Sequence, residues 1–270
     1  MLLQPTRYEA PKDAEAVPPP AEGADQSVQG TIHTLGPLDI AIVYDGGQSV
    51  QCMNKYFICR ISRYFASAFD GNFKEAGTRV IYLRHDFPWG VYAMLDFLKN
   101  GTYWMYPRLK EQYPHFTMLD LHVHCYILAD KYDILALADY SATNYLRMAA
   151  EILSLDWSCD DPDYYDASED VPFVEYLADD MCAAAEVSRF LNSIALLWGN
   201  TPGYDDLRTS MLQLLSACFI KLMRLKSFQY LLMFLDDFID DMVMVLSKDD
   251  IEVTLLPIET GEGISWTFRD

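Results

Sequence analysis

Residues 39–53, DIAIVYDGGQSVQCM, decide the fold of the first half of the chain. The first six residues are rich in β-branched and aromatic side chains, which favour a strand. Asp45-Gly46-Gly47 has the composition of a tight turn, and residues 49–53 follow it as a return strand. The stretch therefore predicts a β-hairpin.

The segments that follow the hairpin predict helices around one further strand. Residues 55–60 and 62–69 have helical patterns, and residues 80–83 form a short β-rich run. Pro88 begins another helix, and residues 118–131 predict a longer one. In the helix after Pro88 the apolar residues recur at helical spacing: Val91, Met94, Leu95 and Leu98. The order predicts an α+β fold in which helices dominate.

Composition divides the chain into five segments. Residues 1–36 contain few large apolar side chains and predict a disordered arm, which precedes a domain at 37–150. Residues 151–172 are rich in carboxylates and predict an acidic linker. Residues 173–248 are densely apolar at helical spacing and predict an all-helical extension, and residues 249–270 form a C-terminal tail.

Three helices are expected in the extension. The first covers residues 173–198. Thr201 is the expected cap of the second, with Pro202 at its first helical position. The third is expected at residues 227–246.

The sequence from residue 38 to residue 145 resembles the BTB/POZ family, in particular its small stand-alone fungal-type members. The resemblance rests on short pieces that occur in the family's order and spacing: DIAIV at 39–43, NKYFIC at 54–59, YFASAF at 64–69, FKE at 73–75, VIYL at 80–83, MLDFL at 94–98, GTY at 101–103 and YILADKYDI at 126–134. Two positions depart from the family pattern. Asn54 stands where histidine is usual, and Ser62-Arg63 stands where the family has Ser-Pro.

The resemblance implies a BTB/POZ fold, a small sheet with flanking helices, followed by the helical extension. It also implies protein association rather than catalysis. The expected partners are a cullin-type ubiquitin ligase scaffold with client proteins, for which the chain would be a substrate adaptor. The alternative is a self-associating structural or transcription-regulatory protein with no role in ubiquitin transfer.

Phe73 and Glu75 are the candidate partner-binding residues. Phe73-Lys74-Glu75 matches the hydrophobic-x-Glu pattern with which cullin-binding members of the family contact their scaffold. An exposed aromatic side chain fills a partner's pocket, and the carboxylate two residues later pairs with a donor. The alternative is that Phe73 covers the edge of the core and Glu75 is merely solvated.

Asp39 and Lys55 match the charged-pocket pair of the family's dimeric transcription regulators. A carboxylate within an apolar strand is costly unless it is paired. The favoured interpretation is an Asp39–Lys55 contact within the chain. The dimer interpretation requires a helix within residues 1–36, where no helical apolar period occurs.

No catalytic, cofactor or metal site is expected. The nucleotide-binding and nucleophile motifs are missing from the sequence. His122 and His124 are two residues apart on a helix and point to different sides, so they do not share a metal ion. His122 with Cys125 supplies only two ligands, too few for a zinc site.

The net charge and the hydropathy of the sequence argue against nucleic acids and membranes as partners. Forty acidic against twenty basic residues give a net charge of −20, which repels nucleic acid and anionic membranes. No apolar run reaches the roughly 18–20 residues of a membrane span, and residues 1–7 lack a signal-peptide pattern. The expected location is therefore the cytoplasm, the nucleus or both.

Overall fold

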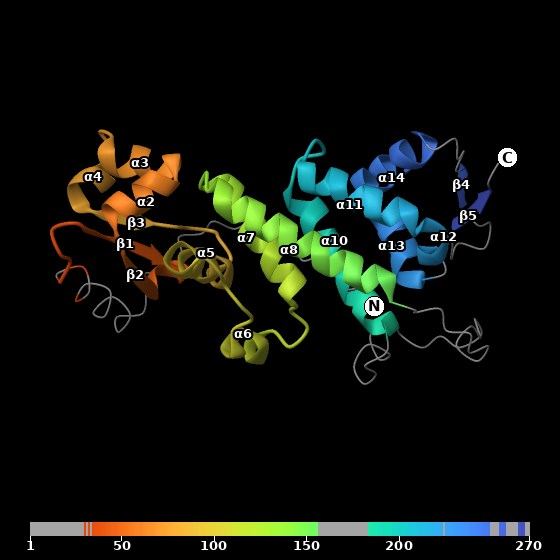
Figure 1. Ribbon diagram of the computed structural model, residues 1–270, viewed down its shortest axis with the longest axis horizontal. Helices are drawn as coiled ribbons and strands as arrows, with labels where there is room; N and C mark the ends of the chain where they lie inside the picture. Colours follow the sequence, from red (N-terminus) through yellow and green to blue (C-terminus); the bar gives the residue numbers. More distant parts are fainter. Residues whose placement is uncertain are drawn as a thin grey trace, which may run out of the picture. The chain divides into compact units, whose positions relative to one another are not determined.

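The computed structural model describes residues 30, 32, 34–155, 183–223, 225–248, 254–257 and 264–267 (Figure 1). The chain divides into two compact units, and the boundary lies between Thr143 and Asn144. We call the described residues up to Thr143 the N-terminal unit and those from Asn144 the C-terminal unit. The expected arm and the expected acidic linker lie outside the described residues, except for positions at their edges.

A three-stranded sheet organises the N-terminal unit. The hairpin is formed by β1 (Asp39–Tyr44) and β2 (Ser49–Asn54), and β3 (Val80–Tyr82) pairs in parallel with the other side of β1. Alternate residues of β1 point to opposite faces, so Ile40 and Ile42 enter the main core. The other face of β1 is covered by a small cluster that includes Ile32 and Leu35.

The hairpin turn adopts the left-handed conformation that its sequence permits. The short 3-10 turn η1 (Asp45–Gly47) has positive φ at all of its residues: Asp45 at 56°, Gly46 at 62° and Gly47 at 93°. Aspartate and glycine tolerate this region better than other residues do. The predicted hairpin, including its turn, is therefore confirmed.

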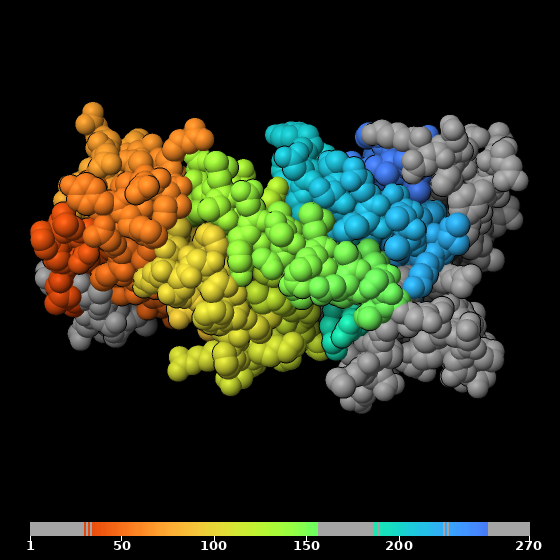
Figure 2. Space-filling view, in the orientation of Figure 1, coloured from red at the N-terminus to blue at the C-terminus, as the bar shows by residue number. Residues whose placement is uncertain are grey.

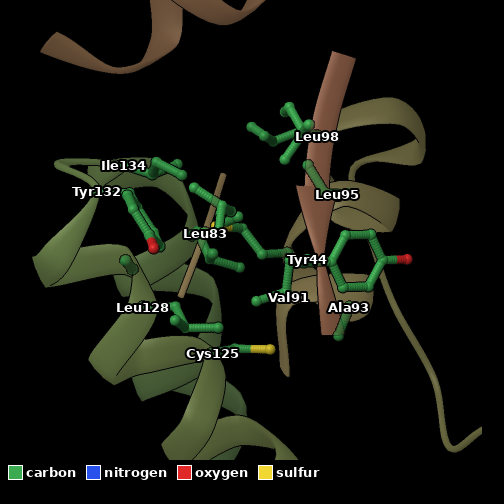
Figure 3. Close-up of a cluster of buried hydrophobic side chains, with 14 of the residues drawn as sticks. Tyr44, Leu83, Val91, Ala93, Leu95, Leu98, Cys125, Leu128, Tyr132 and Ile134 are labelled. Atoms are coloured by element: carbon green, nitrogen blue, oxygen red, sulfur yellow. The ribbon is translucent and has the colours of Figure 1, made fainter. Parts of the chain in front are cut away.

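Helices surround the sheet on the side of the main core. They are α2 (Lys55–Ile61), α3 (Arg63–Asp70), α4 (Lys74–Thr78), α5 (Pro88–Asn100), α6 (Pro107–Gln112), α7 (Met118–Lys131) and α8 (Leu135–Ser154), the last of which crosses the boundary between the units. Figure 3 shows part of the main core, where Val91 of α5 lies beside Cys125 and Leu128 of α7. The predicted α+β class is confirmed.

Tyr132 joins three parts of the N-terminal unit at the end of α7. Its backbone carbonyl accepts a 2.6 Å hydrogen bond from the buried Ser62 hydroxyl, which also caps α3 by accepting from Phe65 N at 3.1 Å. Its ring stacks on Phe65 at 5.6 Å and meets Tyr64 edge-on at 5.0 Å. Its hydroxyl donates to Asp86 Oδ2 at 2.5 Å.

The neighbours of Tyr132 in the sequence strengthen this junction. Lys131 Nζ lies 2.5 Å from Asp86 Oδ1, and Asp133 pairs with Arg63 at 2.9 Å. Asp133 has a φ of 50°, a left-handed conformation that ends α7 and that aspartate tolerates. We call Ser62, Asp86, Lys131, Tyr132 and Asp133 the Tyr132 clamp. It fixes the α2–α3 turn and the segment after β3 to the end of α7.

Between residues 183 and 248 the described part of the C-terminal unit consists of helices joined by short connections. Its helices are α10 (Ala183–Asn200), α11 (Asp206–Ala217), α12 (Phe219–Leu222), α13 (Lys226–Phe234) and α14 (Asp236–Lys248). In the tail, β4 (Thr254–Pro257) pairs antiparallel with β5 (Ile264–Thr267). The part of the first expected helix at residues 173–182 lies outside the described residues.

Two details of the predicted extension were wrong. The second helix is capped by Asp205, whose Oδ1 accepts from Leu207 N and Arg208 N at 2.9 and 3.1 Å, and not by Thr201. The expected third helix is interrupted at Leu235, which separates α13 from α14. The interruption allows Phe238 to meet Phe228 edge-on at 6.0 Å, because α14 folds back against α13.

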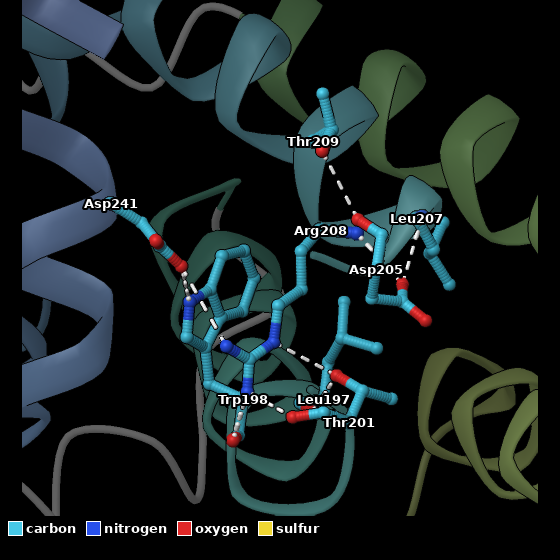
Figure 4. A network of polar contacts seen from close by, with 8 residues as sticks. All are labelled: Leu197, Trp198, Thr201, Asp205, Leu207, Arg208, Thr209 and Asp241. Carbon is cyan, nitrogen blue, oxygen red and sulfur yellow. Dashed lines mark hydrogen bonds and ion pairs between the residues drawn. The ribbon is translucent and has the colours of Figure 1, made fainter. Parts of the chain in front are cut away.

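Arg208 connects three helices inside the C-terminal unit (Figure 4). Only 1% of its side chain is exposed. Its Nε donates to Thr201 Oγ1 at 2.9 Å, and one of its terminal nitrogens donates to the carbonyl oxygens of Trp198 and Thr201. Its other terminal nitrogen lies 3.7 Å from Asp241, which also accepts from Trp198 Nε1 at 2.9 Å. Thr201 thus binds a buried guanidinium group instead of capping α11.

Replacing Ser62 by alanine should lower the free energy of unfolding by about 2–3 kcal/mol. The change removes a helix cap and leaves the buried Tyr132 carbonyl and Phe65 N–H without their partner. The exposed Ser67 in the same helix provides the control, because Ser67→Ala should change stability by less than about 0.5 kcal/mol. Urea unfolding followed by circular dichroism measures both. Equal free energies of unfolding for Ser62→Ala and Ser67→Ala would contradict a stabilising role of the Tyr132 clamp.

Arg208→Ala should lower the free energy of unfolding by about 3 kcal/mol, because it leaves two buried carbonyl groups without their donor and removes the ion pair with Asp241. Arg208→Lys should recover only part of that loss, since an ammonium group lacks the planar fork of guanidinium. The matched control is Arg147→Ala, which breaks an exposed pair with Glu151 and should cost less than about 1 kcal/mol. Thermal unfolding of the three variants gives the comparison.

Candidate protein-interaction surface

Three consecutive helices after the hairpin carry the candidate partner-binding residues. Each of the first two begins at a side-chain cap: Asn54 Oδ1 accepts from Phe57 N at 3.2 Å for α2, and Ser62 caps α3. Asn54 therefore has a local role at the position where the family has histidine. Figure 2 shows the orange segment that contains α3 and α4 at the surface of the N-terminal unit.

Phe73 lies immediately before α4 and is exposed. Its backbone is extended at the N-cap position, and 63% of its surface is accessible. The preceding turn passes through Gly71, where a Cβ atom would lie 2.4 Å from the carbonyl oxygen of Ser67. Glycine therefore allows the chain to leave α3 tightly and places Phe73 outside the core.

Glu75 lies in the first turn of α4, where a carboxylate interacts favourably with the helix N-terminus. Its backbone carbonyl accepts from Arg79 N at 2.8 Å, which closes the helix at a left-handed residue. Among the described residues its carboxylate forms no ion pair. Burial raises the pKa of the Tyr64 hydroxyl, and the carboxylates of Asp86 and Glu75 raise it further.

Further aromatic side chains are exposed on the two preceding helices. Tyr56 and Phe57 are exposed on α2, and Tyr64 is exposed on α3. We call Tyr56, Phe57, Tyr64 and Phe73 the exposed aromatic set. Tyr56, Phe57 and Tyr64 were not predicted as partner-binding residues from the sequence. A signal for two of them was present, because Tyr56 and Phe57 precede the buried Ile58 in an amphipathic turn.

The expected contact between Asp39 and Lys55 does not form within the described residues. Lys55 Nζ instead lies 2.8 Å from Asp70 Oδ1 and donates to the carbonyl oxygen of Phe69 at 2.9 Å. A lysine is attracted to this position because the last carbonyl groups of α3 have no helical partner and carry partial negative charge. The hydrogen bond to Asp70 raises the pKa of the Lys55 ammonium group.

Asp39 remains half-buried at the beginning of β1, opposite Asn54. Burial raises the pKa of the Cys52 thiol, and the carboxylate of Asp39 raises it further. The two charged-pocket candidates are therefore not brought together by an ion pair: Lys55 connects α2 to the end of α3, and Asp39 stays in the hairpin.

The histidine residues of α7 belong to the core. His122 Nδ1 lies 2.7 Å from the Tyr103 hydroxyl, which is also 2.9 Å from Ser141 Oγ, and all three residues are buried. His124 points elsewhere and stacks on Phe87 at 4.4 Å. Burial lowers the pKa of His124 to about 4, so its ring is neutral at physiological pH.

The described part of the chain contains no group of three or more His, Cys, Asp or Glu side chains that could hold a metal ion. Among its helices, none has both the length and the apolar character needed to cross a membrane. The features with the clearest capacity for binding are therefore the exposed aromatic side chains and the adjacent carboxylate.

Comparison with known proteins adds no assignment. No protein-family model and no curated protein matches this sequence. The surface geometry and the residue-level resemblance remain the basis for a proposal about function.

Proposed function

We propose that the chain is a BTB/POZ-type protein-interaction module that acts as a substrate adaptor for a cullin-type ubiquitin ligase. The observation that carries the proposal is the exposure of Phe73 directly before α4, two residues from the carboxylate of Glu75 in the first turn of that helix. A buried Phe73 would have no area to contribute to a partner. An aromatic side chain that is already presented to solvent gains the full free energy of burial when it enters a pocket.

The supporting structure around Phe73 favours a preformed contact. Ser62 caps α3 and is bound to the Tyr132 carbonyl, while Lys55 joins the start of α2 to the end of α3. Because these contacts hold α2 and α3 in place, α4 follows from a fixed point. A partner that binds Phe73 and Glu75 would lose little free energy in ordering this surface.

In this proposal the C-terminal unit recruits the client. Its described residues include three large apolar side chains that are well exposed: Tyr204, Ile220 and Phe234. Exposed aromatic and branched side chains are common contacts at protein interfaces. The protein would act in the cytoplasm, the nucleus or both.

Self-association is the second candidate function, and the exposure of Tyr56 and Phe57 on α2 favours it. These side chains could bury against a second copy of the chain. An adaptor binds a cullin N-terminal domain, whereas a purely self-associating module forms only homo-oligomers. Size-exclusion chromatography with light scattering, with and without the cullin domain, separates the two candidates.

Phe73→Ala should weaken binding to a cullin N-terminal domain by about 2 kcal/mol or more and change the stability of the free chain by less than about 1 kcal/mol. Glu75→Lys should also weaken binding, because it places a cation where the proposal requires a carboxylate. Isothermal titration of the full chain measures binding, and thermal unfolding of the same preparations measures stability.

Trp104→Ala is the matched control, since Trp104 is 55% exposed and lies in the segment between α5 and α6, away from α4 in the sequence. It should leave cullin binding unchanged. Loss of about 3 kcal/mol or more in the stability of Phe73→Ala would contradict the proposal, because that is the cost of truncating a core phenylalanine. Failure of the wild-type chain to bind at micromolar concentrations would also contradict it.

A further inference from the structure

A short segment before the hairpin covers the outer face of the sheet, which is turned away from the main core. Ala41 and Val43 of β1 point to this face, and neither has any exposed surface. The half-buried side chains of Ile32 and Leu35 pack against the small apolar cluster to which both belong. Apolar area that is removed from water in this way holds the segment on the sheet. We call Ile32, Leu35 and Gly36 the N-terminal strap.

A single arginine fastens the strap to the end of α4. Arg79 Nη1 donates to the carbonyl oxygen of Gly36 at 2.7 Å, although the two residues are 43 positions apart in the sequence. The same carbonyl oxygen accepts from Asp39 N at 3.2 Å, at the start of β1. The strap is therefore attached both to the hairpin and to Arg79.

The backbone of Arg79 joins α4 to the sheet. Its N–H group donates to the Glu75 carbonyl oxygen at 2.8 Å, which closes α4. Its carbonyl oxygen accepts from Ala41 N at 2.9 Å, where β3 begins to pair with β1. The backbone and the side chain of one residue thus connect the strap, the sheet and the helix that carries Glu75.

This residue has an unfavourable backbone conformation. Arg79 has a φ of 59° and a ψ of 25°, in the left-handed region that arginine rarely adopts. Such a conformation persists only where the surrounding contacts hold it, and it occurs often in switch regions. Without the hydrogen bond to Gly36, only the two backbone hydrogen bonds to Glu75 and Ala41 would hold Arg79.

The candidate surface depends on this closure because α4 is short. The helix spans five residues, and the residue before it provides no side-chain cap. A helix of this length is not stable by itself, so contacts at its ends decide whether it forms. Phe73 lies directly before α4, and Glu75 lies in its first turn. The geometry of both residues therefore depends on how α4 is held at Arg79.

We infer that the N-terminal strap acts through Arg79 to hold α4 in its binding geometry, so that lifting the strap turns the contact at Phe73 and Glu75 off. Arg79 is then a positioning residue, which acts by holding α4. A protein that binds the chain just before Ile32 would compete with the sheet for the strap and release Arg79. The effect on binding rests on the proposed cullin contact, whereas the coupling between the strap and α4 does not.

Hydrogen–deuterium exchange of the full chain without a partner tests the coupling. Leu35→Asp places a carboxylate on the apolar face and should lift the strap. Arg79→Asn removes the guanidinium group, and asparagine tolerates the left-handed backbone. Each substitution should speed exchange within residues 74–80 by about tenfold, the effect of one lost hydrogen bond. Arg79→Lys keeps a donor and should restore part of the protection.

The two substitutions should not be additive. Once Leu35→Asp has lifted the strap, Arg79 has lost its acceptor, so adding Arg79→Asn should speed exchange by less than about twofold more. Leu35→Ala takes the place of Leu35→Asp if thermal unfolding shows that the latter is not folded. The control is Arg84→Asn, which removes an exposed guanidinium group that lies 5.9 Å from the Tyr82 ring. It should leave exchange within residues 74–80 unchanged.

Titration of the same variants with a cullin N-terminal domain separates the inference from the proposed function. Leu35→Asp and Arg79→Asn should each raise the Kd by about fivefold or more, because the partner must then pay to order α4. Arg84→Asn should leave the Kd unchanged. Absence of binding by the wild-type chain would contradict the proposed function, and the exchange rates would still decide whether the strap holds α4.

Three results would overturn the inference. The first is unchanged exchange within residues 74–80 in both Leu35→Asp and Arg79→Asn. The second is full additivity of the two substitutions, which would mean that the strap and Arg79 hold α4 separately. The third is faster exchange with an unchanged Kd for the cullin domain, which would mean that the strap does not control the contact.

Discussion

The N-terminal unit depends on the contacts of Tyr132 at the end of α7. The backbone carbonyl of Tyr132 accepts a hydrogen bond from the Ser62 hydroxyl. Its ring stacks on Phe65, and its hydroxyl donates a hydrogen bond to Asp86. Burial, together with the Asp86 carboxylate, raises the pKa of the Tyr132 hydroxyl, so it stays protonated and remains a donor. These contacts connect segments that are 46 and 70 residues apart in the sequence.

The same contacts determine how the candidate surface is presented. The Ser62 hydroxyl accepts from Phe65 N at the start of α3 and donates to the Tyr132 carbonyl, and α3 ends at Asp70, next to the Lys55 ammonium group. Gly71 then allows the sharp exit that leaves Phe73 outside the core. The candidate surface thus lies on short helices that are held in place by the Tyr132 clamp and by Lys55.

Turn residues and apolar periodicity predicted the helices and strands well. The predictions that failed concerned which side chains contact each other across the fold. The hairpin at residues 39–53 and the helix beginning at Pro88 depend on turn chemistry and periodicity, which the sequence carries directly. Lys55 was paired with Asp39 because the two match a charged pair of the BTB/POZ pattern and because a carboxylate within an apolar strand is costly unless paired. The ammonium group of Lys55 instead pairs with Asp70 at the end of α3. Thr201 was the expected cap of α11, but its hydroxyl accepts a hydrogen bond from the buried Arg208, and Asp205 caps the helix instead. The helix break at Leu235 is signalled by Asp236 and Asp237, since acidic residues favour a helix N-terminus.

The central claim is that a cullin-type partner binds Phe73 and Glu75 at the start of α4. Hydrogen–deuterium exchange of the full chain, with and without a saturating cullin N-terminal domain, tests it most directly because it locates the contact without any substitution. The account predicts slower exchange within residues 55–78 on binding and unchanged exchange in α10–α14. Protection confined to the C-terminal helices, or no protection anywhere, would contradict it.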